Sequence, residues 1–191
     1  MTFLLNKKIF LLYLFLFING FASPLINKAY AASVRSGEYE LKTAYIYNFT
    51  KFITWPASSF KNNEEVIKLC LLGDDHFGSA IDILKDKKSM GKGFAIKRIP
   101  TLNGKNRELQ SCHIIVISPS EKKKLPQIFL LSNNLAILTI SDLDGFARQG
   151  GIIGFEMKDK RITFSINIDV AKDSKLKISS ELLKLSEVVR K

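Results

Sequence analysis

Two cysteines and two histidines are the residues whose chemistry is easiest to place in this chain of 191 residues. Cys70 and Cys112 lie too far apart for the C-x-x-C motif of redox enzymes, and two cysteines are too few for structural zinc, which takes four ligands. If the chain is exported, one disulfide between them is the simplest expectation, because thiols oxidise outside the cytosol. Such a bridge would stabilise the fold by about 4 kcal/mol in the chain-entropy model.

Neither histidine has the neighbours that catalysis or metal binding requires. His76 follows Asp74 and Asp75 after an apolar run, and His113 begins another apolar run. The H-E-x-x-H, G-x-S-x-G and P-loop patterns are absent from the sequence. Residues 142–145 (DLDG) lack the later ligands of a calcium loop. We therefore expect no catalytic residue, metal or cofactor, and a binding or regulatory protein rather than an enzyme.

Residues 1–31 are typical of a secretory signal peptide. Lys7 and Lys8 precede an apolar run over residues 9–18, which is too short to cross a bilayer core. Small residues favour cleavage after Ala31, with cleavage after Ala22 and an uncleaved N-terminal anchor as the alternatives. Cleavage after Ala31 leaves residues 32–191 as a single exported domain.

The chain is basic, with a formal charge of +11 that falls to +8 once Lys7, Lys8 and Lys28 are removed. A basic chain often binds nucleic acid, but export argues against that partner. The lysines are also scattered, apart from one run at residues 122–124. We read most of this charge as solvated surface, and weak attraction to an anionic membrane or an acidic partner as its remaining role.

Short apolar strands alternate with helices along the rest of the chain. This pattern predicts an α/β fold with a mixed, mostly parallel sheet flanked by helices and an antiparallel hairpin at one edge. The expected strands lie at 66–73, 94–100, 113–120 and 134–141, with the hairpin at 151–168. The expected helices lie at 38–53, 75–85, after residue 120, and at the C-terminus after Ser179 or Ser180, where residues 182–189 would supply an apolar side. Residues 32–37 are expected to be a flexible start.

The helix expected over residues 38–53 is rich in aromatic residues. One row at helical spacing is expected to face the core, namely Leu41, Tyr45, Phe49 and Phe52. Tyr47 lies outside that row, and Trp55 follows the helix end. These two, with the nearby Asn48 and Lys51, form a candidate partner-binding surface, because exposed aromatic residues anchor interfaces. The alternative is that Trp55 packs over the sheet as a lid on the core.

A second candidate surface lies between residues 141 and 151, after an expected buried strand. Open α/β sheets place ligand sites in loops at the carboxyl ends of strands. Asp142, Arg148, Gly150 and Gly151 are the candidate residues in this loop. The alternative is structural, since the two glycines would allow a tight entry into the next strand.

Five segments in order resemble the YfiR family of exported proteins, from about Tyr39 to Val189: YELKTAYIYNFTKFITWP, IKLCLLGDDHFG, SCHIIVIS, LTISDLDGFARQGGIIGF and RITFSINIDVAKDSKLKISSELLKLSEVV. The most specific marks are Y-N-F-x-K-F-x-x-W-P, S-D-x-x-G-F-A-x-x-G-G and L-K-I-S-S-x-L-L-K-L. In this resemblance Cys70 and Cys112 correspond to the family's shared disulfide. A second cysteine pair of some members, in the region of residues 146–153, is absent here, which argues against redox control through that pair.

The resemblance implies a periplasmic repressor that binds the sensor domain of an inner-membrane diguanylate cyclase. Repression would lower cyclic di-GMP and biofilm formation. The resemblance also implies release by an OmpA-like outer-membrane lipoprotein, and a homodimer. The alternative function is a periplasmic small-molecule-sensing protein that acts on another membrane signalling protein, such as a sensor kinase.

Overall fold

The computed structural model describes residues 24–60, 65–103, 107–132 and 134–190. The chain divides into two units, Met1–Glu38 and Tyr39–Lys191. The charged and apolar parts of the predicted signal peptide, and its alternative cleavage site after Ala22, lie outside the described residues, whereas Ala31 lies within helix α2. None of the described helices combines the length and the hydropathy that crossing a membrane requires.

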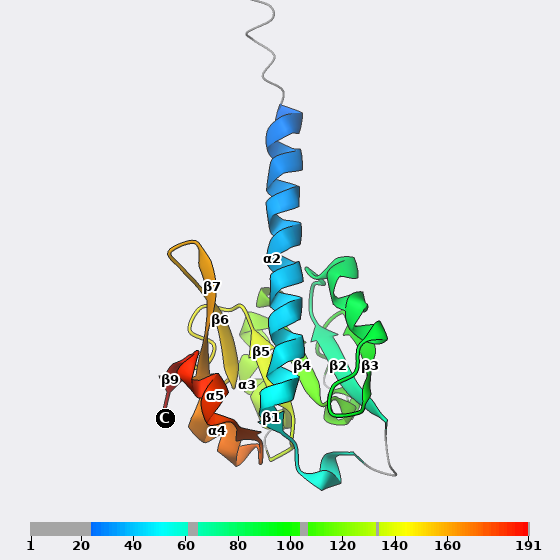
Figure 1. The fold of residues 1–191 in the computed structure, drawn as a ribbon, viewed down its shortest axis with the longest axis vertical. Coiled ribbons are helices and arrows are strands. Elements are labelled where there is room, and N and C mark those ends of the chain that lie inside the picture. The colour runs from blue at the N-terminus through cyan, green and yellow to red at the C-terminus, as the bar shows by residue number, and fades with distance from the viewer. Residues whose placement is uncertain (1–23, 61–64, 104–106, 133, 191) are drawn as a thin grey trace, which may run out of the picture. The chain divides into compact units, whose positions relative to one another are not determined.

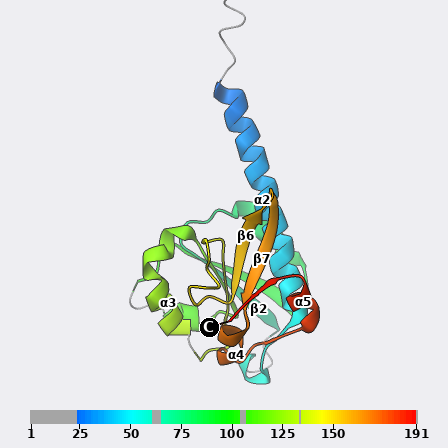
Figure 2. The same cartoon turned by 90° about the vertical axis from the view of Figure 1, so that its left-hand side faces the viewer.

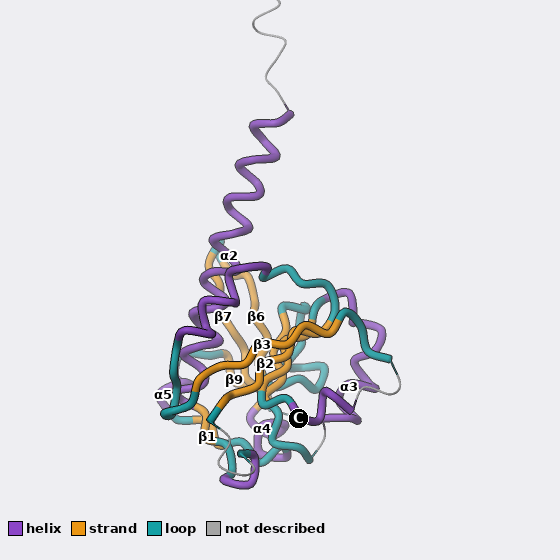
Figure 3. The backbone as a smooth tube through the Cα atoms, turned by 90° about the vertical axis from the view of Figure 1, so that its right-hand side faces the viewer, coloured by secondary structure: helices purple, strands orange, loops and turns teal. Residues whose placement is uncertain are grey.

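The larger unit is built around a seven-stranded sheet with the order β3-β2-β4-β5-β6-β7-β9 (Figure 1). The strands are β2 (Val66–Leu72), β3 (Gly93–Ile99), β4 (Ile114–Ile117), β5 (Leu138–Ser141), β6 (Ile153–Lys158), β7 (Arg161–Asn167) and β9 (Glu187–Val189). The first five strands in this order, β3, β2, β4, β5 and β6, each pair parallel with their neighbours. Figure 3 shows β3 and β2 side by side. Strand β7 pairs antiparallel with β6, and β9 pairs parallel with β7. The predicted mixed sheet with an antiparallel hairpin is confirmed.

Two apolar layers cover the sheet, because successive side chains of a strand point to opposite faces. In β2, Leu69 and Leu71 point to the layer that contains α2, whereas Cys70 and Leu72 point to the layer that contains α3. Figure 2 shows α3 on one side of the sheet and α2 with α5 on the other. The helices are α2 (Pro24–Phe52), η1 (Ala57–Ser59), η3 (Gly78–Asp86), η4 (Arg107–Ser111), η5 (Pro119–Lys124), α3 (Leu125–Ser132), α4 (Ile168–Asp173) and α5 (Ser180–Lys184).

Helix α2 begins at Pro24, well before the expected residue 38. Proline is tolerated in the first turn of a helix, and residues 25–36 contain neither glycine nor a further proline to interrupt it. Residues 32–37, expected to be flexible, are therefore helical. The helix ends where β1 (Ile53–Thr54) pairs antiparallel with β8 (Lys177–Ile178).

The buried side of α2 differs from the predicted row. Leu41 is 47% exposed, so its assignment to the core is wrong. The buried positions recur at spacings of three and four residues: Tyr39, Lys42, Thr43, Ile46, Phe49 and Thr50. The prediction holds for Phe49, which is buried, and for Tyr45 and Phe52, which pack partly buried against the core. It failed at Leu41 because polar residues, among them a lysine, complete the buried face, and apolar spacing alone does not select them.

The predicted C-terminal helix is also shorter than expected. Helix α5 is capped by the Ser179 side chain, which accepts the Leu182 N–H, and it ends at Lys184. Val188 and Val189 lie in β9. Residues with branched Cβ atoms favour strands, and the free edge of β7 supplies the backbone partners.

Candidate functional site

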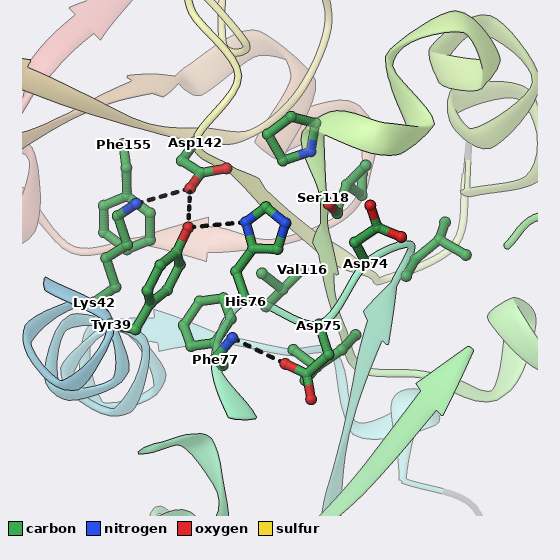
Figure 4. Close-up of a pocket in the computed structure, with 14 residues that line it drawn as sticks. Tyr39, Lys42, Asp74, Asp75, His76, Phe77, Val116, Ser118, Asp142 and Phe155 are labelled. Atoms are coloured by element: carbon green, nitrogen blue, oxygen red, sulfur yellow. Dashed lines mark hydrogen bonds and ion pairs between the residues drawn. The ribbon is translucent and has the colours of Figure 1, made fainter. Parts of the chain in front are cut away.

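The order of the parallel strands reverses between β2 and β4. The chain passes from β2 outward to β3, then returns across β2 to β4 and β5. Such a reversal opens a crevice at the carboxyl ends of the two strands, which is where open α/β sheets bind ligands. Asp75 and His76 follow β2, Ser118 follows β4 and Asp142 follows β5. These residues line a cavity that we call the switch-point pocket (Figure 4).

Helix α2 contributes Tyr39 and Lys42 to the switch-point pocket. The two residues share a helix face because they are three positions apart. Lys42 Nζ lies 2.7 Å from Asp142 Oδ2. Tyr39 Oη lies 3.4 Å from the same carboxylate oxygen and 3.1 Å from His76 Nδ1. Figure 4 shows these four side chains in one network, which connects α2 with the loops after β2 and β5.

The ion pair between Lys42 and Asp142 is largely removed from solvent, with side chains that are 5% and 22% exposed. Lys42 Nζ also lies 4.6 Å from the centroid of the Tyr39 ring, within the range of a cation–π contact. Removing one partner of a buried pair leaves an uncompensated charge and costs about 3 kcal/mol or more. The pair therefore fastens α2 to the loop after β5.

The loop after β2 is shaped by Asp75. Its Oδ1 accepts the backbone N–H groups of Phe77 and Gly78, each at 2.9 Å. Its Oδ2 lies 2.7 Å from Arg98 Nε, which donates from β3. Arg98 also donates to Asp82, and this hydrogen bond is the main reason that the pKa of Asp82 is lowered. Asp75 is thus engaged in holding the loop.

A second buried carboxylate, Glu121, lies near the end of β4 in η5. Its Oε1 accepts from the Thr101 hydroxyl at 2.7 Å, and its Oε2 accepts from the Leu102 N–H at 3.0 Å. Lys124 Nζ lies 3.2 Å from Oε2. Burial by itself would raise the pKa of Glu121, but these hydrogen bonds and the lysine charge outweigh it, so the pKa is lowered.

The switch-point pocket has little free space. Its volume is about 20 Å³, which accommodates one water molecule. The Asp75 and Asp142 carboxylates are already engaged by cations. The described residues include no cluster of three or more His, Cys, Asp or Glu side chains that could hold a metal ion. The network of Tyr39, Lys42, His76 and Asp142 therefore attaches α2 to the loops after β2 and β5. Loss of any of these interactions would loosen that attachment.

The four residues of the predicted partner-binding surface differ in exposure, so they do not form one surface. Asn48 and Lys51 are exposed. Tyr47 is half-buried; its hydroxyl donates to the Lys88 carbonyl at 3.1 Å, and Lys51 Nζ lies 4.2 Å from its ring centroid. Trp55 is 6% exposed and packs in the core, so its assignment to the surface is wrong. After α2 the chain is extended, and alternation along it turns Trp55 inward.

The second predicted surface is also divided. Asp142 lies in the switch-point pocket. Arg148 is exposed and forms an ion pair with Glu187 of β9. These two residues therefore contact different elements.

Gly150 and Gly151 of that surface have structural roles. Gly150 has a φ of +107°, which favours glycine. A Cβ on Gly151 would overlap the ring of the buried Phe146. This agrees with the structural alternative for both glycines.

The predicted disulfide is present between Cys70 and Cys112, whose Cα atoms are 6.1 Å apart. Cys70 lies in β2, and Cys112 lies two residues before β4. Both are buried in the layer that contains α3. The bridge therefore joins β2 to the residues just before β4, the two strands between which the sheet order reverses.

Sequence reasoning did not identify Tyr39 and Lys42 as site residues. One signal was available: Lys42 shares a helical row with the apolar Ile46 and Phe49, and a buried lysine requires an anionic partner. The identity of that partner, Asp142, depends on a contact between residues 100 positions apart, which the local pattern does not contain.

A family model described as YfiR/HmsC-like matches residues 39–187. No curated protein matches the chain. The family match covers the larger unit except for its last four residues, 188–191.

Proposed function

Because the chain belongs to the YfiR/HmsC-like family, whose members are periplasmic regulators of cyclic di-GMP signalling, we propose that it represses an inner-membrane diguanylate cyclase. In this proposal residues 1–31 direct export to the periplasm, and the mature domain binds the cyclase's periplasmic sensor domain. Cyclic di-GMP and biofilm formation then fall. The observation that carries the proposal is the family match, because it includes residues 39–52 of α2, the switch-point pocket and the disulfide together.

The proposed contact surface is the outer stripe of α2, formed by Leu41, Ala44, Asn48 and Lys51. All four are exposed, and their spacings of three and four residues place them on one helix face. Leu41 is 47% exposed, and a large apolar side chain at such a position suits a partner helix. Tyr47 flanks the stripe through its contact with Lys51.

Release of the repressor is the second half of the proposal. An OmpA-like outer-membrane lipoprotein would remove the protein from the cyclase, and the protein would act as a homodimer. Both ideas come from the family resemblance. Light scattering on the mature chain tests the dimer, and capture by the lipoprotein's periplasmic domain tests the release.

Cellular cyclic di-GMP, measured with the gene deleted and then restored, tests the function. We expect a rise on deletion that the full-length chain reverses and a chain lacking residues 1–31 does not. An unchanged level, with the protein shown to be expressed, would contradict the proposal.

The outer stripe is tested by Leu41→Glu. This change places a charge in the proposed contact, so we expect loss of repression and of binding to the isolated sensor domain. Leu130→Glu is the matched control, because Leu130 is 76% exposed on α3, in the opposite layer. Equal effects of both variants would assign the loss to solubility and not to the contact.

Small-molecule sensing is the alternative, and the place of the switch-point pocket at the strand reversal supports it. A larger ligand would have to displace the loop after β2, which carries His76, since the pocket accommodates one water molecule. Ligand binding raises stability, so a specific thermal shift with a metabolite, with cyclic di-GMP unchanged on deletion, would favour this function.

A further inference from the structure

The hairpin of β6 and β7 extends beyond the strands on either side of it. Strand β5 pairs with β6 only at Ile153 and Gly154. Strand β9 pairs with β7 only at residues 165–167. Among the described strands, residues 155–158 and 161–164 therefore pair only with each other. Figure 1 shows this part of the hairpin standing beyond its neighbours.

The base of the hairpin is held rigidly. Phe155 and Phe164 are buried, and their rings pack against Tyr45 and Phe49 of α2 at centroid distances of 4.9 to 6.1 Å. The Tyr45 hydroxyl donates to the Ile162 carbonyl at 3.4 Å. The base of the hairpin thus packs against the core, and the protruding end continues from a fixed base.

The turn at the tip is tight and places Lys160 in a conformation that is uncommon for lysine. Asp159 and Lys160 have φ values of +49° and +60°. A two-residue turn with both residues left-handed normally has asparagine, aspartate or glycine at the first position and glycine at the second, where this chain has Lys160. Lysine gains nothing locally from this position, which suggests that its side chain is needed there.

The tip has the composition of a membrane-binding element. Lys158, Lys160 and Arg161 are exposed, and with Asp159 they give a net charge of +2. Within the described part of the chain, none of these three cations takes part in an ion pair. Beside them Met157 is 61% exposed, and its long apolar side chain is suited to insertion among lipid headgroups.

We propose that the tip of the β6–β7 hairpin, residues 157–161, binds the surface of a bilayer that contains anionic phospholipids. The three cations would contact lipid phosphates, and Met157 would enter the headgroup region. A flat bilayer suits a convex tip, whereas an acidic protein would need a matching groove. The contact would be peripheral and weakened by salt, since only a few charges take part. This inference does not rest on the proposed repression of a cyclase.

Cosedimentation of the mature chain with vesicles tests the proposal. One set of vesicles contains equal parts of phosphatidylglycerol and phosphatidylcholine, and the other contains phosphatidylcholine alone. We expect binding to the first set only, decreasing as salt rises. The pair Lys158→Ser with Lys160→Ser should lower the partition coefficient about thirtyfold, because each lysine near an anionic surface contributes about 1 kcal/mol. Met157→Ser should lower it further.

The control is Lys172→Ser with Lys184→Ser, which removes the same charge. Both lysines are exposed, in α4 and α5, at the end of β7 away from the tip (Figure 1). We expect this control to lower the partition coefficient far less. Equal losses in both double variants would overturn the tip as the site, and no binding to either vesicle set would overturn membrane binding altogether. Tip variants that bind vesicles normally but no longer bind the cyclase's sensor domain would overturn membrane binding by the tip and assign the tip to an acidic protein partner.

Discussion

Lys42 shows how one polar residue can determine which face of a helix is buried. Its ammonium group is paired with Asp142, so its aliphatic stem can occupy the core row of α2 while Leu41 remains exposed. The same pair attaches α2 to the loop after β5. At the residue scale, packing and the candidate site therefore depend on one interaction.

Replacing Lys42 with alanine should destabilise the protein. The change leaves the Asp142 carboxylate without its cation, and we expect the free energy of unfolding to fall by about 3 kcal/mol. Urea denaturation followed by circular dichroism measures this. The double variant Lys42→Met with Asp142→Leu should recover most of the loss, because it removes both charges. A single variant as stable as the unaltered chain would show that the pair does not fasten α2.

Glu121 should make stability depend on acidic pH. Its pKa is lowered in the folded state, so the unfolded chain binds the proton more readily. The ionised carboxylate therefore stabilises the fold above its unfolded pKa of about 4.3, and this contribution is lost as pH falls through the lower folded value. Glu121→Gln should lower the stability at neutral pH by about 2 kcal/mol and flatten its fall below pH 4.3. Melting temperatures measured across this range would contradict the prediction if both chains lost stability in parallel.

At the scale of elements, the strands were predictable and the helix limits were not. Runs such as VIKLCLL and IIVI are short, apolar and rich in residues with branched Cβ atoms, which favours buried strands. The C-terminal segment 182–189 has apolar residues at helical spacing, yet its end pairs with β7. That outcome depends on a free strand edge elsewhere in the fold, which local periodicity does not report.

The disulfide joins two elements, and its loss should lower the melting temperature markedly. A loop closed by residues 42 positions apart is worth about 4 kcal/mol in the chain-entropy model. For a domain of this size that corresponds to a fall of about 10 °C. Calorimetry with and without reductant measures it. Reductant should not affect the variant Cys70→Ser with Cys112→Ser, and a reductant effect that persists there would contradict the assignment.

At the scale of the whole molecule, strand order determines which residues meet. Asp142 was identifiable from the sequence because it follows an expected strand, but its partners Tyr39 and Lys42 come from a helix that crosses the sheet. The protrusion of the hairpin tip could not be predicted from the sequence either, because it depends on how far the neighbouring strands extend. The sequence could therefore predict the layers of the fold and some residues of each site. Which residues from distant segments come together depends on the topology of the sheet.

Strand β3 forms one end of the seven-stranded sheet. Among the described residues no strand pairs with its outer side, and a bare edge of this length invites pairing with another chain and aggregation. Lys97 and Arg98 lie on β3, and both are exposed and charged. A second chain could pair there only by removing water from these charges, so the edge resists self-association. Arg98 also donates a hydrogen bond to Asp75 and so fixes the loop after β2. Colloidal stability of the protein and the shape of its pocket therefore depend on the same side chain.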